Sequence, residues 1–348
     1  MKTLSICIPV MGEKSVERTV DSIINSGVDG IEYEILVLRN GIKETMQLPD
    51  DSQGRKNIRT ISIPEAGKGK ALNRGTEAAK GEIIMVIDAD CKVERNAVKW
   101  LLSAFDDEKI MAASGKIEAM SEKESLIEKI QMIEYVKAFD MSRYIFNKMN
   151  ADFLISGAFG AFAKSELKEI GGYDEKTVGE DIELVLRLQK KFYHCGKKIA
   201  YVRDAICYTG VPKKMGRLLR QRDRWQRGLL YSLIKYRSML FNPKYRNLGL
   251  ISLPLQLIFE LLGPFFIISG LLGIMKNIIP FAVITGIWGA DLLSTAFLLK
   301  RNKIKIRKIG NSFFAAALFT IISIPIQILL SFRRIFAMLT YKKRKMVW

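Results

Sequence analysis

Short apolar runs alternate with helical patterns over the first 90 or so positions of the chain. Four of these runs predict buried strands, at residues 4–10, 35–38, 57–63 and 82–87. A helical pattern at 16–25 follows the first run, and a loop entering a helix at 67–80 precedes the fourth. Continuous apolar runs are typical of parallel strands that are covered on both faces. The pattern predicts an open α/β sheet, in which ligands bind beyond the carboxyl ends of the strands.

Helical patterns continue in the next hundred residues. Residues 122–144 and 181–190 place apolar side chains at three- and four-residue spacings, and a shorter helix is expected at 165–170. Between them lies a small apolar run at 157–162. We therefore expect residues 1–212 to form one globular domain of the α/β class.

The last third of the chain differs from the α/β pattern, because it contains three long apolar segments. They lie at residues 249–275, 278–299 and 313–332, after an amphipathic stretch at 215–236. Each segment approaches or exceeds the ~20 residues that span a bilayer. We expect an interfacial region at 213–247, about three transmembrane helices within 248–334 and a basic tail at 335–348. The alternative is that the three segments are buried helices of a soluble protein.

The charge distribution favours the membrane. The chain has 55 Lys and Arg against 36 Asp and Glu, a formal net charge of +19. Residues 1–212 contain 31 basic and 33 acidic residues, whereas residues 213–348 contain 24 and 3. Basic residues beside apolar runs are typical of the cytoplasmic side of a membrane protein, and a nucleic-acid binder more often has a basic stripe on a polar fold. We expect an integral protein of the cell (cytoplasmic) membrane, with its globular domain in the cytoplasm and no nucleic-acid partner.

The basic clusters do not all agree with one orientation. The loop 300–308, with six basic residues, fits the cytoplasmic side. A third crossing would then place the basic tail outside, so one apolar segment is expected to be interfacial or re-entrant. The four cysteines lack metal-ligand spacing and suit a reducing cytoplasm.

Two aspartates directly follow the fourth predicted strand. Asp88 and Asp90 would lie at the carboxyl edge of the sheet, where two carboxylates can hold Mg²⁺ or Mn²⁺ and leave room for phosphate oxygens. The alternative is that they cap a helix. Gly67–Lys70 forms a basic loop near the same edge, either a simple turn or a phosphate contact.

Two further motifs carry candidate chemistry. Gly179, Glu180 and Asp181 open a helix, where the acids either favour the helix terminus or supply a general base. Gln221, Arg224 and Trp225 lie on the amphipathic stretch. They are either part of a surface helix or a platform for a sugar ring beside groups that face phosphate.

Taken together and in order, these blocks are distinctive. They read ICIPV, GKGKALNRG, VIDAD, SGAFGAF, GGYDEKTVGEDIEL and QRDRWQRG. The set resembles the family-two inverting glycosyltransferases, particularly the membrane-embedded processive synthases of hyaluronan, chitin, cellulose or poly-N-acetylglucosamine. The resemblance implies a GT-A type, Rossmann-like domain and a nucleotide-sugar donor, usually a UDP-sugar.

The resemblance also implies roles for individual residues. Asp181 would be the catalytic base, Asp90 would hold Mg²⁺ or Mn²⁺, and Asp88 would lie near the nucleotide. The other implied substrate-binding residues are Pro9, Val10, Glu13, Asn40, Lys68, Asn73, Gly157, Glu180, Gln221, Arg224 and Trp225. One departure is that Arg39-Asn40-Gly41 follows the second strand, where the family often has a pair of acids.

Three interpretations of the whole chain stay open at this point. The first is a membrane-bound polysaccharide synthase, whose acceptor is the growing polymer. The second is a glycosyltransferase that adds one sugar to a lipid acceptor. The small number of apolar segments favours it, because a conduit for a growing polymer would need more than three. A polymer synthase with so few segments would form a homo-oligomer or would not translocate its product alone. The third is a non-catalytic membrane component with a degenerate sugar-binding domain.

Overall fold

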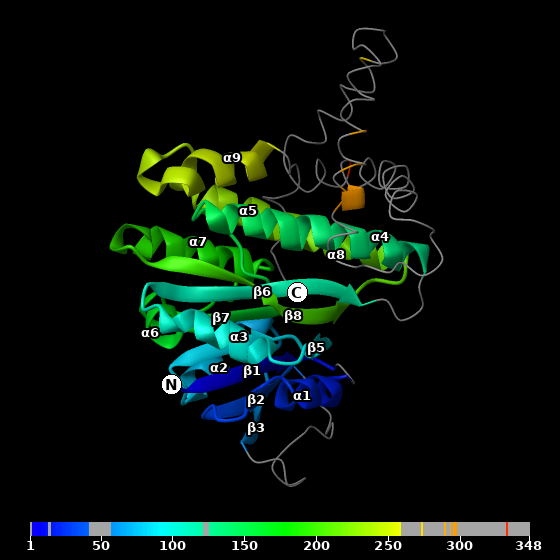
Figure 1. Ribbon diagram of the computed structural model, residues 1–348, viewed down its shortest axis with the longest axis vertical. Helices are drawn as coiled ribbons and strands as arrows, with labels where there is room; N and C mark the ends of the chain where they lie inside the picture. The colour runs from blue at the N-terminus through cyan, green and yellow to red at the C-terminus, as the bar shows by residue number, and fades with distance from the viewer. Residues whose placement is uncertain are drawn as a thin grey trace.

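An eight-stranded sheet forms the centre of the computed structural model (Figure 1). The structure describes residues 2–12, 15–41, 57–120, 125–258, 273, 289, 293, 295–297 and 332. The strand order is β3-β2-β1-β4-β7-β6-β8-β5. The four predicted strands are β1 (Leu4–Val10), β2 (Tyr33–Asn40), β3 (Ile58–Ile63) and β4 (Ile83–Ile87). These four are parallel to one another, which confirms the predicted α/β sheet and brings the ends of β1 and β4 to one edge.

The other half of the sheet is mixed, and the sequence pattern predicts little of it. β7 (Phe159–Ala163) is antiparallel to both β4 and β6 (Ile110–Met120). β8 (Lys198–Gly210) is parallel to β6 and antiparallel to β5 (Cys91–Val93). β6 and β8 include charged residues, and much of β8 is only partly buried, so neither forms a continuous apolar run. The antiparallel β7 brings the residues just before it to the edge where β4 ends.

Helices cover both faces of this sheet. One face packs against α1 (Val16–Ile24) and α3 (Ala97–Ser103), through strand residues such as Ile6 and Ile8. The opposite face packs against α2 (Lys68–Ala78), α6 (Lys164–Glu169) and α7 (Glu180–Phe192). A third apolar cluster joins the outer side of α7 to α8 (Met215–Lys235) and α9 (Leu253–Gln256). The catalytic candidates on α7 and α8 therefore share one packed layer.

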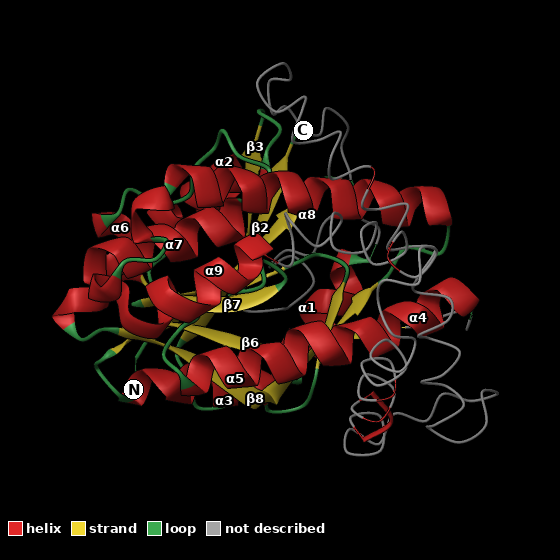
Figure 2. Ribbon diagram, turned by 90° about the horizontal axis from the view of Figure 1, so that it is seen from above, coloured by secondary structure: helices red, strands yellow, loops and turns green. Residues whose placement is uncertain are grey.

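The helix predicted at 122–144 is a rod of three parts. α4 (Leu126–Tyr135) is followed by a π-helical stretch (Val136–Met141) and by α5 (Ser142–Lys148), while residues 121–124 lie outside the described residues. Asp140 in the π-helical stretch is buried and accepts hydrogen bonds from Arg203 Nε at 2.8 Å and Nη2 at 2.6 Å. Figure 2 shows this rod and α8 from above, and the two helices contact each other where Phe139 meets Trp225 and Arg222 donates to Glu134. Such wide turns frequently occur at functional sites.

Two glycines allow α8 to approach the start of α7. A Cβ atom added to Gly228 would lie 2.6 Å from Gly179 Cα, and one added to Gly179 would lie 2.4 Å from Gly228 Cα. Both obstacles are backbone atoms, which have no rotamer by which to move away. The position of α8 over the first turn of α7 thus depends on the absence of side chains at this crossing.

The predicted membrane region falls almost wholly outside the described residues. The first apolar segment, 249–275, is described mainly up to residue 258, through a π-helical turn (Leu248–Ser252) and α9. Segments 278–299 and 313–332 are described at single positions only, and the loop 300–308 and the tail 335–348 are not described. Among the helices that are described, none combines the length and the apolar character needed to cross a bilayer. The transmembrane helices stay a prediction.

Gly228→Ala should separate α8 from α7. The added methyl group meets backbone, so we expect a loss of about 1–3 kcal/mol of stability, typical of overpacking, and reduced enzymatic activity. Gly216→Ala is the matched control on the same helix, because nothing lies within 4 Å of its Cβ position. Thermal unfolding of both variants measures the effect. Equal melting temperatures for the two variants would contradict the proposed close contact.

Candidate active site

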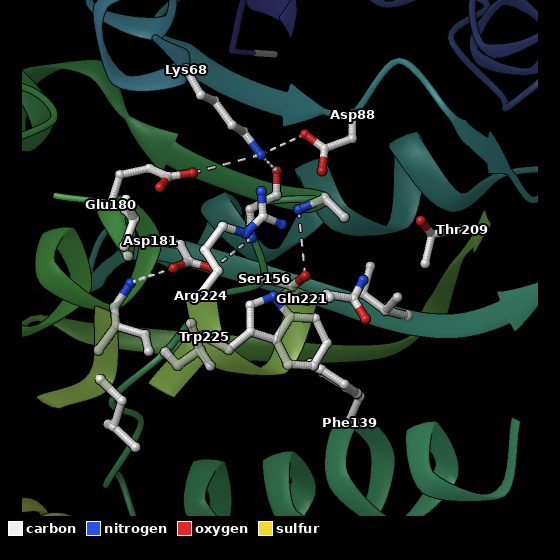
Figure 3. A pocket seen from close by; sticks show the side chains of 18 of the residues that line it. Lys68, Asp88, Phe139, Ser156, Glu180, Asp181, Thr209, Gln221, Arg224 and Trp225 are labelled. Atoms are coloured by element: carbon white, nitrogen blue, oxygen red, sulfur yellow. Dashed lines mark hydrogen bonds and ion pairs between the residues drawn. The ribbon is translucent and has the colours of Figure 1, made fainter. Parts of the chain in front are cut away.

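A cavity of about 640 Å³ lies at the edge where β1 and β4 end. The sheet edge and the start of α7 form one wall, and α8 with the π-helical stretch forms another (Figure 3). The sequence-predicted residues that line it are Pro9, Asn40, Lys68, Asp88, Asp90, Gly157, Glu180, Asp181, Gln221, Arg224 and Trp225. Segments up to more than 200 positions apart in the sequence are thus gathered around one space.

Lys68 connects three of the segments that meet there. Its Nζ lies 2.5 Å from Asp88 Oδ1 and 3.0 Å from the carbonyl oxygen of Gly157, to both of which it donates. Glu180 Oε1 lies 3.9 Å from the same Nζ. These contacts join the first residue of α2 to the end of β4, to the loop before β7 and to the start of α7. One ammonium group therefore lies between two carboxylates at the sheet edge.

Burial and neighbouring charges shift the pKa values of Lys68 and Glu180. Burial alone would lower the pKa of Lys68, but the Asp88 and Glu180 carboxylates outweigh it and raise that pKa, so the lysine stays charged. Burial raises the pKa of Glu180, against the opposing charge of Lys68. Perturbed carboxyl groups in a cleft are typical of functional sites, although structural ion pairs also produce them.

Asp181 lies one residue into α7 and faces the cavity. Its Oδ1 accepts a hydrogen bond from the backbone N–H of Ile182 at 2.8 Å, and its Oδ2 accepts one from Gly157 N–H at 3.3 Å. A Cβ at Gly157 would lie 3.1 Å from Lys68 Nζ and 3.6 Å from Asp181 Oδ2, so a glycine there leaves both groups their present positions. Asp181 therefore presents its carboxyl group to the cavity from the first turn of α7.

Asp90 is the residue best placed for a divalent cation. Its carboxylate lines the cavity, and the facing position in β8 is Gly210, whose Cβ would lie 3.9 Å from Asp90 Oδ2. Asp88 is already bound to Lys68. Within the described residues, no group of three or more His, Cys, Asp or Glu could hold a metal ion. The donor set nevertheless fits Mg²⁺ or Mn²⁺, which need only one or two carboxylates when phosphates and water complete their shell.

Trp225 is fixed in the wall formed by α8. The guanidinium carbon of Arg222 lies 4.2 Å from the centre of its ring, and Arg222 Nη2 donates to Glu134 Oε2 at 2.7 Å. Phe139 meets the indole edge-on, with ring centres 6.0 Å apart (Figure 3). The nearby Gln221 Oε1 is buried and accepts no hydrogen bond from any described residue. A ligand in the cavity would supply the donor that this oxygen lacks.

Two predicted binding residues have other surroundings, and a third is not described. Asn73 does not line the cavity, because its amide exchanges hydrogen bonds with the backbone of Tyr173 at 2.7 and 3.0 Å. Val10 is fully buried in the core, and its carbonyl oxygen accepts from Asn40 Nδ2 at 3.1 Å. Glu13 lies outside the described residues. Asn40 lines the cavity and also connects the end of β1 to Gly67, whose N–H it accepts at 3.1 Å.

The cavity lining also includes a cation that the motifs did not indicate. Arg143 on α5 is 6 % exposed, and its guanidinium carbon lies 5.8 Å from the ring centre of Phe139 and 5.9 Å from that of Phe153. A single arginine in a helical pattern gives no sequence signal of such a position. Nearby Asp152 is also buried and accepts from Asn147 Nδ2 at 3.0 Å. Burial raises the pKa of Asp152 to about 6, although Asn147 and Arg143 act in the opposite direction.

Asp152→Asn should change how stability depends on pH. A carboxyl group with a raised pKa keeps its proton longer in the folded than in the unfolded chain, so the wild type loses stability as the pH rises from the ordinary value of 3.8 to about 6. Two pKa units correspond to a loss of up to about 3 kcal/mol. Urea unfolding across and above this window should show the variant gaining stability relative to the wild type, with a constant difference at higher pH. Parallel curves for the two proteins would contradict the assignment.

Comparison with known proteins agrees with this geometry. The model of the family described as "Glycosyltransferase like family 2" matches residues 3–228. A probable glycosyltransferase, YdaM, of Bacillus subtilis is 30% identical over 253 residues, which cover 70% of this chain and 59% of that protein. A poly-beta-1,6-N-acetyl-D-glucosamine synthase of Staphylococcus epidermidis is 29% identical over 217 residues, or 62% of this chain and 51% of the synthase. The chain thus matches only somewhat more than half the length of these relatives.

A solved structure with the same fold supports the architecture. It is the mannosyltransferase PcManGT of Pyrobaculum calidifontis, in complex with GDP-mannose and Mn²⁺. The likeness has a TM-score of 0.64 and 17% identity and covers 99% of this chain and 88% of the mannosyltransferase. It shows a shared GT-A fold. With the family match over residues 3–228, it follows that this chain is a glycosyltransferase and belongs to glycosyltransferase family 2.

Proposed function

We propose that this enzyme transfers a sugar from a nucleotide-diphosphate sugar, UDP-linked as is usual in the family, to a hydroxyl group of a growing polysaccharide. The observation that carries the proposal is the position of Asp181. Its carboxylate lies at a helix N-terminus in the cavity wall, beside the Lys68–Asp88–Glu180 group and across from Trp225. A base in that position can reach an acceptor while the donor's diphosphate lies at the sheet edge.

The step itself is a single displacement. Asp181 takes the proton of the acceptor hydroxyl, and the acceptor oxygen forms a bond to the anomeric carbon of the donor sugar. The bond from that carbon to the diphosphate oxygen breaks on the opposite face, and the nucleotide diphosphate leaves with the electron pair. The configuration of the anomeric carbon is therefore inverted. The glycosylated acceptor, the nucleotide diphosphate and a protonated Asp181 account for all atoms.

The residues at the donor end would bind and neutralise the diphosphate. Asp90 would hold Mg²⁺ or Mn²⁺, which when bound supplies positive charge against the leaving group. Arg224 on α8 lines the same cavity and would approach the phosphates from the other side. Lys68 keeps Asp88 and Glu180 from repelling an anionic donor, because its ammonium lies between the two carboxylates. Pro9 and Asn40, at the ends of β1 and β2, would border the nucleoside.

The residues at the other wall would position the sugar and the acceptor. Trp225 is fixed by Arg222 and Phe139, so its ring is a rigid apolar surface on which a sugar can stack. Gln221 has a buried oxygen that can accept a hydrogen bond from a sugar hydroxyl. These contacts suit a pyranose lying between α8 and Asp181.

A polymer is the proposed acceptor because one relative is named a poly-beta-1,6-N-acetyl-D-glucosamine synthase. Membrane attachment through residues 248–334 is part of the same proposal, as are contacts with membrane lipids and homo-oligomerisation. The second candidate is transfer of one sugar to a lipid acceptor, and the apolar end of the cavity around Phe146, Phe153 and Leu229 favours it. Product length distinguishes the two candidates, since a ladder requires repeated addition and a single added sugar excludes it.

Asp181→Asn should abolish transfer and leave donor binding largely intact. The amide keeps the size of the side chain but cannot take the proton, so we expect a loss of about 100- to 10,000-fold in rate. Transfer is measured with full-length chain, radiolabelled UDP- and GDP-sugars, and Mg²⁺ or Mn²⁺ present or removed by a chelator. Binding of the nucleotide sugar is measured in parallel by calorimetry.

The matched control is Asp106→Asn, an exposed aspartate remote from the cavity lining. It should transfer sugar at the wild-type rate. An Asp181→Asn variant with undiminished transfer would refute Asp181 as the base, and a variant that no longer binds the donor would assign Asp181 to donor binding instead.

A further inference from the structure

Arg143 is a buried cation in the lining of the cavity, carried by α5. Only 6 % of the residue is exposed, yet it lines the same space as Asp181. Its nearest well-defined contacts are the faces of two aromatic rings, Phe139 and Phe153, at 5.8 and 5.9 Å. Asp181 and Gln221 are accounted for by the proposed transfer, whereas nothing in that step uses Arg143.

The guanidinium has no carboxylate within ion-pairing distance among the described residues. Asp152 and Asp181 are close enough to raise its pKa, but burial has the larger effect and lowers it. Asp152 Oδ2 accepts a hydrogen bond from Asn147 Nδ2 and not from the arginine. Arg222, the other buried arginine among the described residues, is paired with Glu134 at 2.7 Å. Arg143 therefore differs from Arg222 in lacking a counter-ion.

An unpaired buried charge is destabilising, and cation–π contacts offset only part of that cost. An arginine remains protonated under these conditions, because its pKa lies far above neutrality. The missing counter-ion is therefore expected to come from a bound molecule. The surrounding wall is apolar and is formed by Phe146, Phe153 and Leu229, so an anion there would be poorly hydrated and strongly attracted.

The position of Arg143 indicates which substrate would carry this anion. The donor's diphosphate has Lys68, Arg224 and the Asp90 position at the sheet edge, and Arg143 lies instead on α5, near the apolar cluster shared by α7, α8 and α9. Asp181 lies in the same cavity, where it accepts a hydrogen bond from Gly157 and is near enough to Arg143 to influence its pKa. A group bound to Arg143 would thus belong to the molecule that presents its hydroxyl to Asp181.

We propose that Arg143 binds a phosphate or carboxylate group of the acceptor, close to the hydroxyl that receives the sugar. This inference rests on the proposed transfer reaction and narrows its acceptor to an anionic one. The planar guanidinium can donate two parallel hydrogen bonds to either group. The anion has two potential sources, the headgroup of a lipid and an acidic sugar unit of a polymer, and both present the same chemistry to Arg143.

Binding of small anionic probes to the full-length protein tests the proposal without knowledge of the natural acceptor. Dodecyl phosphate represents the lipid source and methyl β-glucuronide the acidic sugar, with dodecyl maltoside and methyl β-glucoside as their neutral counterparts. Calorimetry is performed on the wild type, Arg143→Gln, Arg143→Lys and the control Arg74→Gln, whose side chain is 62% exposed. Thermal unfolding shows that each variant is folded.

We expect at least one anionic probe to bind the wild type and to lose tenfold or more in affinity in Arg143→Gln. Arg143→Lys should recover part of the loss, because it keeps the charge without the paired donors. Arg74→Gln should bind like the wild type. The proposal is overturned if neither anionic probe binds the wild type better than its neutral counterpart, or if Arg143→Gln binds both anionic probes as well as the wild type does.

Two further measurements distinguish the anion site from the proposed transfer reaction and from a purely electrostatic effect of Arg143 on Asp181. Hydrolysis of the nucleotide sugar in the absence of acceptor is measured for the wild type and the control Arg74→Gln, and its absence from both would count against the proposed function rather than against the anion site. If Arg143 acted only by its charge on Asp181, the pH profile of transfer would move equally for neutral and anionic acceptors. That result would also overturn the anion site.

Discussion

The ion pair between Lys68 and Asp88 is the contact on which the rest of the site depends. Through this lysine, the first turn of α2 reaches the end of β4, the loop before β7 and the start of α7. Without the ammonium group, the carboxylates of Asp88 and Glu180 would face each other across a partly buried space. Like charges at such positions raise one another's pKa and open the structure. Lys68 thereby fixes where α7 begins, and with it the direction of Asp181.

The second constraint is the close contact of Gly179 with Gly228, which places α8 over the same helix start. α8 carries Gln221, Arg224 and Trp225, so the distance between Asp181 and these three side chains is set by two residues without side chains. The π-helical stretch completes this wall, because Arg203 holds Asp140 while the adjacent Phe139 meets Trp225. The cavity thus has a charged end at the sheet edge and an apolar end near α9.

The sequence predicted the parallel half of the fold and most of the residues at the charged side of the cavity. Continuous apolar runs identified β1 to β4, and Asp88, Asp90, Glu180 and Asp181 lie in short blocks at the ends of elements, where side chains reach the cavity. The sequence did not predict β6 and β8, since charged residues interrupt their apolar pattern. Asn73 does not line the cavity, and sequence alone cannot show this, because a helix-surface amide that holds a neighbouring loop looks the same as one that binds a ligand. Arg143 gave no signal, since its importance comes from tertiary burial and not from spacing.

The central claim is that Asp181 and the diphosphate lie on opposite faces of the transferred sugar. The configuration of the product tests it most directly. Proton NMR of the anomeric signal, recorded on product made from an α-linked nucleotide sugar, should show a β linkage. An α-linked product would mean retention of configuration, and it would contradict a single displacement with Asp181 as the base.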